Sequence, residues 1–125
     1  MSIVVDMATL LTSITTDIYY DDMPDTPANL IALYHSGGSP SSHAFGQQAP
    51  AWDNPTFQVR IRHTSAATAL TRAESVKTAL DGKNNTTIDG HKYLSVFLMG
   101  DILALGKDDK KRSEYALNFQ ASVQR

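Results

Sequence analysis

The stretch that decides the fold is Thr56-Phe57-Gln58-Val59-Arg60-Ile61-Arg62-His63-Thr64. Apolar and polar side chains alternate along it, which is the period of a β-strand with one face in a core. Phe57, Val59, Ile61 and His63 share one face, and Gln58, Arg60 and Arg62 share the other. We therefore predict a half-buried strand whose outer face is polar and cationic.

Helical periodicity is found on both sides of this strand. Near the start of the chain, apolar residues recur at helical spacing and predict a helix of about four turns. These residues are Ile3, Met7, Leu10, Leu11, Ile14 and Ile18. A second amphipathic helix follows the strand, and its apolar stripe is Ala66, Leu70, Ala73, Val76 and Leu80. Gly82 provides that helix with a C-terminal stop.

Other segments have the patterns of strands. Leu30–Tyr34 is a short run that is apolar on both faces, as in an interior strand. Tyr93–Met99 is strand-like, Glu114–Val123 alternates again, and a turn region has room for a short edge strand at Thr86–Ile88. Ile102–Asp109 is apolar and ends in a charged turn. Because the last strands follow one another through short connections, we predict an α+β fold. It has a small, mostly antiparallel sheet of about four to five strands with two main helices packed on one face.

Between the first two strand patterns lies a segment rich in Gly, Ser and Pro. It contains Ser36-Gly37-Gly38-Ser39-Pro40-Ser41-Ser42 and continues to Pro55. We predict a long loop at about residues 36–55, within a single domain that spans residues 1–125. Such a loop is either a surface insertion or a segment that orders against a partner.

The composition excludes several classes of protein. Hydrophobic residues make up 42% of the 125 residues, which is enough for a continuous core. The net charge of −2 does not fit a protein that holds nucleic acid on a large basic surface. Cysteine is absent, which excludes disulfides and thiolate chemistry. No stretch has the roughly 20 apolar residues of a membrane span, and no secretory leader pattern is present, so we expect a protein made in the cytoplasm and no membrane contact.

The sequence has no motif for catalysis or for binding a metal ion. Its four histidines lack the H-x-H and H-E-x-x-H spacings. Asp21, Asp22 and Asp25 lie in a proline-rich turn that lacks the Gly and the distal Glu of a calcium loop. We expect no catalytic residue, no metal and no cofactor. A small enzyme or a ligand-binding module is the alternative from a different class.

Three segments, in this order, resemble a known family. They are Asp25-Thr26-Pro27-Ala28-Asn29-Leu30-Ile31-Ala32-Leu33-Tyr34 followed by Gly37-Gly38, then Asn54-Pro55-Thr56-Phe57-Gln58-Val59-Arg60-Ile61-Arg62, and then Leu105-Gly106-Lys107-Asp108-Asp109-Lys110-Lys111-Arg112-Ser113-Glu114-Tyr115-Ala116-Leu117-Asn118-Phe119. Together they resemble the tail-terminator (tail-completion) proteins of long-tailed phages, often labelled "minor capsid protein". The resemblance runs from about Met1 to Gln124.

This resemblance implies a structural virion protein. Members of the family form a homohexameric ring on the head-proximal end of the tail tube. The ring stops polymerisation of the tube and presents a docking surface for head-tail joining. The implied partners are further copies of the chain, the major tail tube protein and the head-completion (connector) protein, while DNA only passes through the lumen. Another neck or tail component, such as a head-completion or tube protein, is the close alternative.

The motif positions supply candidates for contacts with a neighbouring subunit or another partner. We expect the polar residues of the motifs to face such a neighbour. The lone tryptophan either acts as an aromatic anchor at an interface or pins the loop to its own domain. The candidates are Gln58, Arg60, Arg62, Trp52, Asp109, Arg112 and Asn118.

Overall fold

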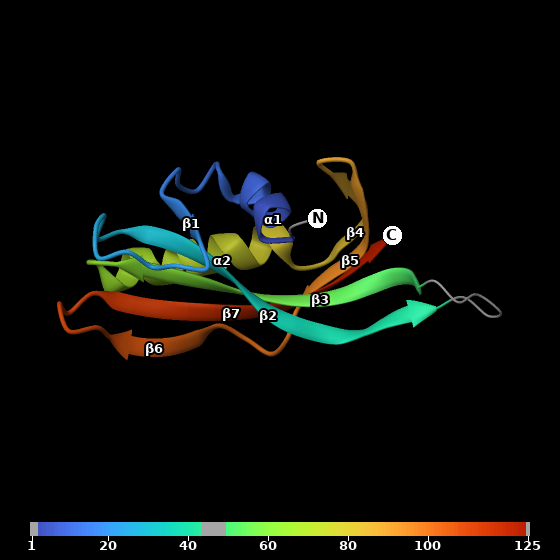
Figure 1. Ribbon diagram of the computed structural model, residues 1–125. Helices are drawn as coiled ribbons and strands as arrows, with labels where there is room; N and C mark the ends of the chain where they lie inside the picture. Colours follow the sequence, from blue (N-terminus) through green and yellow to red (C-terminus); the bar gives the residue numbers. More distant parts are fainter. Residues whose placement is uncertain (1–2, 44–49, 125) are drawn as a thin grey trace.

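The structure is a computed structural model that describes residues 3–43 and 50–124, with side chains for 3–38 and 52–124. Each of the two described helices is followed along the chain by a run of strands (Figure 1). Their bounds are α1 Ile3–Leu11, β1 Ile18–Tyr20, β2 Leu30–His43, β3 Pro50–His63, α2 Ala66–Leu80, β4 Lys83–Ile88, β5 His91–Leu98, β6 Leu103–Lys107 and β7 Ser113–Gln124.

The strands form one mixed sheet of seven strands. Its order is β1-β2-β3-β7-β5-β4, and β6 pairs with β7 beside the end of β5. β1 runs parallel to β2, and the other neighbours are antiparallel. The prediction of a small, mostly antiparallel sheet of about four to five strands is therefore wrong. The sheet also contains β1, β4 and β6, which are short or polar segments without a strong strand pattern in their side chains. They join the sheet because pairing there satisfies the hydrogen bonds of their backbone groups.

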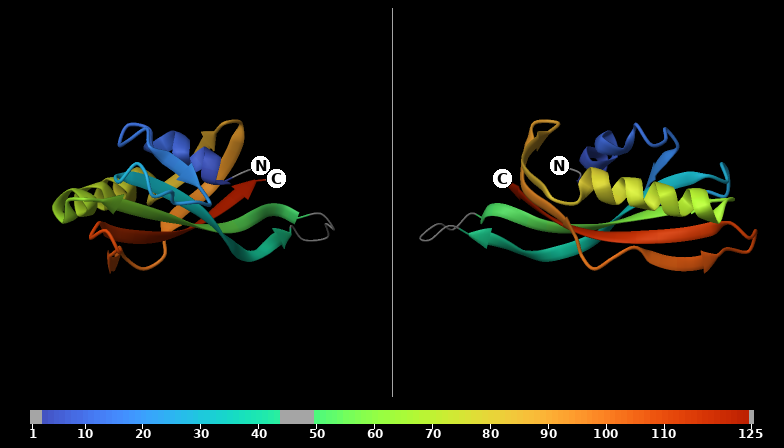
Figure 2. Two further views of the ribbon diagram at one scale, coloured as in Figure 1. Left: turned by 60° about the vertical axis from the view of Figure 1, so that its left-hand side comes forward. Right: turned by 180° about the vertical axis from the view of Figure 1, so that it is seen from behind.

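Both helices cover the same face of the sheet, and no helix of the described residues covers the opposite face, which we call the outer face (Figures 1 and 2). The core lies between the helices and the inner face. Phe57 of β3 stacks on Phe119 of β7 there, with ring centroids 5.2 Å apart. The N-cap of α2 is Ser65, whose side chain accepts a hydrogen bond from the backbone N–H of Thr68 at 3.4 Å. The polar residues that alternate with the core residues of β3 therefore lie on the outer face, away from both helices.

β2 and β3 form a long hairpin that extends past the helices (Figure 1). We call the part beyond His35 and before Phe57 the arm. Its pairing continues to His43 and Pro50, so the prediction of a loop over residues 36–55 is wrong in extent. Residues 44–49, also within that predicted loop, lie outside the described residues. A glycine is required at Gly38, since a Cβ there would lie 2.4 Å from the carbonyl oxygen of Asn54.

The first helix is shorter than its apolar pattern predicts. α1 ends at Leu11, and the chain then turns so that Ile18 enters β1 opposite Ile31. Ile18 still packs against the core, but from the sheet instead of from a helix. An apolar residue at helical spacing can therefore belong to a strand that follows the helix, because either element can bury its side chain in the core.

Candidate assembly interface

Arg62 lies on the outer face of β3, yet it is only 4% exposed. The segment between β1 and β2 covers it, and the guanidinium donates to four backbone carbonyls of that segment. These are Ala28 at 3.0 Å, Pro27 at 2.8 Å, Asp25 at 3.3 Å and Pro24 at 2.5 Å. A guanidinium suits this task because its donors are fixed in a planar fork. Arg62 therefore holds the β1–β2 connection against the sheet.

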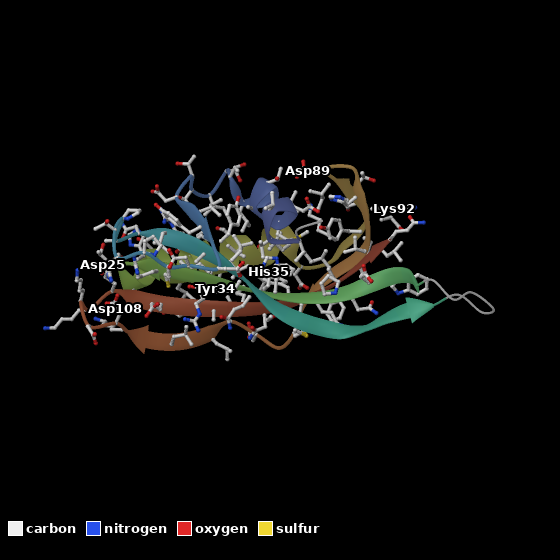
Figure 3. The ribbon with its side chains drawn as sticks, viewed as in Figure 1. Asp25, Tyr34, His35, Asp89, Lys92 and Asp108 are labelled. Carbon is white, nitrogen blue, oxygen red and sulfur yellow. The ribbon has the colours of Figure 1, made fainter. Side chains whose placement is uncertain are left out.

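A second arginine, in the turn just before β7, holds the same connection. Arg112 is 7% exposed and donates to the carbonyl oxygen of Asp25 at 2.7 Å and to its carboxylate at 3.0 Å. Its Nε also donates to the carboxylate of Asp108 at 2.7 Å. Hydrogen bonds from Lys110 and then Arg112 lower the pKa of Asp25, and those from Arg112 lower the pKa of Asp108. Arg62 and Arg112 are thus both bonded within the chain (Figure 3 labels Asp25 and Asp108).

The middle of the outer face carries a connected polar group. Gln58 of β3 donates to the side-chain oxygen of Asn118 on β7 at 3.0 Å and accepts from Arg60 Nε at 2.8 Å. The Arg60 guanidinium lies over the Tyr34 ring, 5.5 Å from its centroid. The structure therefore brings together three of the predicted residues, all half-buried, in one pre-ordered arrangement.

An apolar surface borders this polar group. Four of the seven large hydrophobic side chains exposed among the described residues lie between residues 97 and 105: Phe97, Met99, Leu103 and Leu105. β6 is exposed along its whole length, with Leu103 at 50% and Leu105 at 45%. A strand edge of this kind is one that proteins usually cover or pair. The sequence did indicate an apolar stretch here, but its pattern gave no sign that the stretch would be exposed.

Trp52 and Asp109 lie apart from the polar group. Trp52 is half-buried on β3, opposite Gln124 of β7 and Ser42 of β2, near the far end of the described part of the arm. Asp109 is exposed in the turn between β6 and β7. The role of these two residues in a contact with another subunit stays a prediction.

The inner face contains a buried carboxylate that the sequence reasoning missed. Asp6 of α1 is 2% exposed, accepts a hydrogen bond from the Tyr93 hydroxyl, and lies 2.8 Å from His91 Nδ1. Burial, and then the hydrogen bond to Asp6, raise the pKa of Tyr93. This group ties α1 to β5. The signal in the sequence was a single acidic residue inside an apolar helical stripe.

A shallow groove between α2 and the residues that follow α1 has a volume of about 630 Å³. Its hydroxyl groups on Thr71, Ser75 and Thr78 donate to backbone carbonyls of their own helix. Within residues 3–43 and 50–124, no group of three or more His, Asp or Glu side chains could hold a metal ion. The same part of the chain has no helix long and apolar enough to cross a membrane. The features that distinguish the described surface are thus the outer face of the sheet, which no described helix covers, and the apolar edge of β6. Both suit contacts with other proteins.

Solved structures that share this fold include two that align over most of both chains. One chain, from a structure described as the virion of a native gene transfer agent particle, has a TM-score of 0.63 at 18% identity. It covers 94% of this chain and 86% of its own length. A second has a TM-score of 0.57 at 11% identity over 99% of this chain and 98% of its own. No curated protein matches the sequence.

The family follows from the sequence itself. A family model described as bacteriophage tail terminator protein matches residues 6–125. The chain belongs to this family, which confirms the resemblance found in its motifs. It is therefore a structural protein of the phage tail and a component of the virion.

Proposed function

We propose that this chain caps the head-proximal end of the tail tube as a six-membered ring. The ring stops polymerisation of the tube and gives the head its docking surface. The observation that carries the proposal is the family match over residues 6–125. The neighbours in this role are further copies of the chain, the major tail tube protein and the head-completion (connector) protein. A net charge of −2 is compatible with a lumen that DNA crosses without being held.

A ring of identical subunits needs heterologous contacts, in which one surface meets a different surface of the next copy. The chain has two such different surfaces at opposite ends of the sheet, the arm and the exposed β6 (Figure 2). Neither is covered by a helix. This arrangement supports a ring over a two-fold dimer, whose interface would use the same surface twice.

The candidate residues take different parts in this proposal. Gln58, Arg60 and Asn118 offer a fixed polar group to a partner on the outer face, because their side chains already hold one another in place. Trp52 contributes near the far end of the described arm, and Asp109 contributes at the β6–β7 turn. Arg62 and Arg112 act from inside, by fixing the connection between β1 and β2.

Immunogold labelling of mature particles tests the proposal. An antibody against this chain should place gold at one end of the tail, where it joins the head. Gold distributed along the tube would identify a tube subunit, and gold at the distal tip would identify a tip protein. Either pattern would contradict the proposed role.

A further inference from the structure

We propose that β6 of one copy receives the open edge of β2 of the next copy as an added antiparallel strand. The inference rests on the proposed ring, because it names the two surfaces that meet in it. Strand addition of this kind gains main-chain hydrogen bonds on an exposed edge, and side chains beside the edge give it specificity.

The receiving edge is β6. One side of β6 pairs with β7 from Leu103↔Ala116 to Lys107↔Ser113, and no described strand pairs with its other side. Leu103 and Leu105 are about half exposed there, with Phe97 and Met99 nearby in the chain. The sequence of β6 is Leu103-Ala104-Leu105-Gly106-Lys107, so its one charge is at its end and it contains no proline. An unpaired apolar edge of this kind draws another strand.

The donated edge is the free side of β2. β1 pairs with β2 only from Ile31 to Leu33. The Asp21 carboxylate then accepts from the backbone N–H of His35 at 2.9 Å and closes that pairing. From Ser36 to the end of the strand, β2 has β3 on one side only among the described strands. The arm thus carries an open strand edge away from the body of its own subunit (Figure 1).

The charges at the ends of the two edges favour an antiparallel orientation of the added strand. They also favour a second copy of this chain as the partner. Asp21 and Asp22 are exposed where the open edge of β2 begins, and Asp22 is close enough to affect the pKa of Tyr34. β6 ends at the exposed Lys107 and is preceded by the exposed Asp101. An antiparallel strand brings the two aspartates to Lys107, whereas a parallel strand would bring them to Asp101. Opposite charges therefore meet only in the antiparallel pairing.

The pairing can be tested by disulfide capture, since the chain has no cysteine of its own. A register that places Tyr34 opposite Lys107 places Ser36 opposite Leu105. Both Ser36 and Leu105 are exposed, so Ser36→Cys and Leu105→Cys leave the core intact. Tails from phage that carry the double variant would be oxidised with oxidised glutathione and run without reductant. We expect a ladder of linked copies up to the full ring, and no linkage in either single variant.

Two outcomes of this experiment would overturn the inference. A dimer formed by Leu105→Cys alone would mean that β6 pairs with β6 of another copy. No linkage in the double variant, with the chain still located at the head-proximal end by immunogold, would mean that another protein covers β6. In both cases the proposed capping function could still hold. Absence of the chain from that end would instead contradict the function itself.

A charge exchange provides an independent measurement. Asp22→Lys and Lys107→Asp should each weaken association of the subunits by about tenfold, because each places like charges together. The combined variant should restore association to within a few-fold of the unmodified chain. Equal losses that add in the combined variant would contradict the pairing. Lys92→Asp, on β5, is the matched control and should leave association unchanged.

Discussion

Replacing Arg62 by methionine keeps an apolar stem on β3 but removes every donor to the β1–β2 connection. The two hydrogen bonds with the clearest geometry go to Pro27 at 2.8 Å and Ala28 at 3.0 Å. Hydrogen bonds from a charged donor each contribute about 1.5 to 3 kcal/mol, so we expect the loss of these two to lower the free energy of unfolding by about 3 to 6 kcal/mol. Urea denaturation followed by circular dichroism measures this loss at low protein concentration.

The matched control is Arg60→Met, two residues away on the same face of the same strand. Arg60 is half-buried, donates to Gln58 and lies over Tyr34. A cation–π contact at such a site and one hydrogen bond to a neutral group predict a loss of about 1 kcal/mol. If the two variants lost equal stability, the buried guanidinium would not be holding the connection, and our interpretation of Arg62 as an internal clamp would be refuted.

Three further predictions concern stability. The pKa values of Asp25 and Asp108 lie below the ordinary 3.8 because cationic neighbours hydrogen-bond both carboxylates. The two ionised carboxylates therefore stabilise the folded chain fully above pH 3.8. This contribution to stability is lost as the pH falls through the lowered pKa values. Thermal melts from about pH 6 to about pH 2 should show that loss, and the double change to asparagine should flatten it; an unchanged slope would contradict it. Tyr93→Phe removes the O–H donor from the buried Asp6 and should cost about 1 to 3 kcal/mol in urea denaturation, and a loss below about 0.5 kcal/mol would count against this bond. Gly38→Ala pushes a Cβ into a β3 carbonyl, so limited proteolysis should cut the arm faster than in the unmodified chain, and equal rates would contradict the close packing.

The sequence predicted the elements whose side chains have a strong period. The alternation around Phe57 lies within β3, the alternation after Glu114 lies within β7, and the second helix was found with Leu80 at its end. Each of these elements buries one face, and a periodic pattern of apolar side chains arises because one face is buried. Leu70 was placed in the buried stripe of α2 but is 39% exposed, because it lies at the edge of that stripe.

The parts that could not be predicted depend on contacts distant in the sequence. The residues that follow Ser36 have almost no strand propensity, and they form a strand because β3 supplies their hydrogen bonds. Arg62 occupies an outward position in its strand, and only the three-dimensional path of the β1–β2 connection covers it. β6 has apolar residues, but no described helix covers it. It is exposed because both helices pack on the other face of the sheet.

Electron microscopy of lysates from a phage that lacks this gene tests the central claim most directly. If the chain terminates the tail tube and enables head-tail joining, the lysate will contain filled heads beside separate tails, with some tubes overlong or irregular. Supplying the gene in trans should restore joined particles with tails of uniform length. Normal joined particles in the absence of the gene would contradict the proposed function.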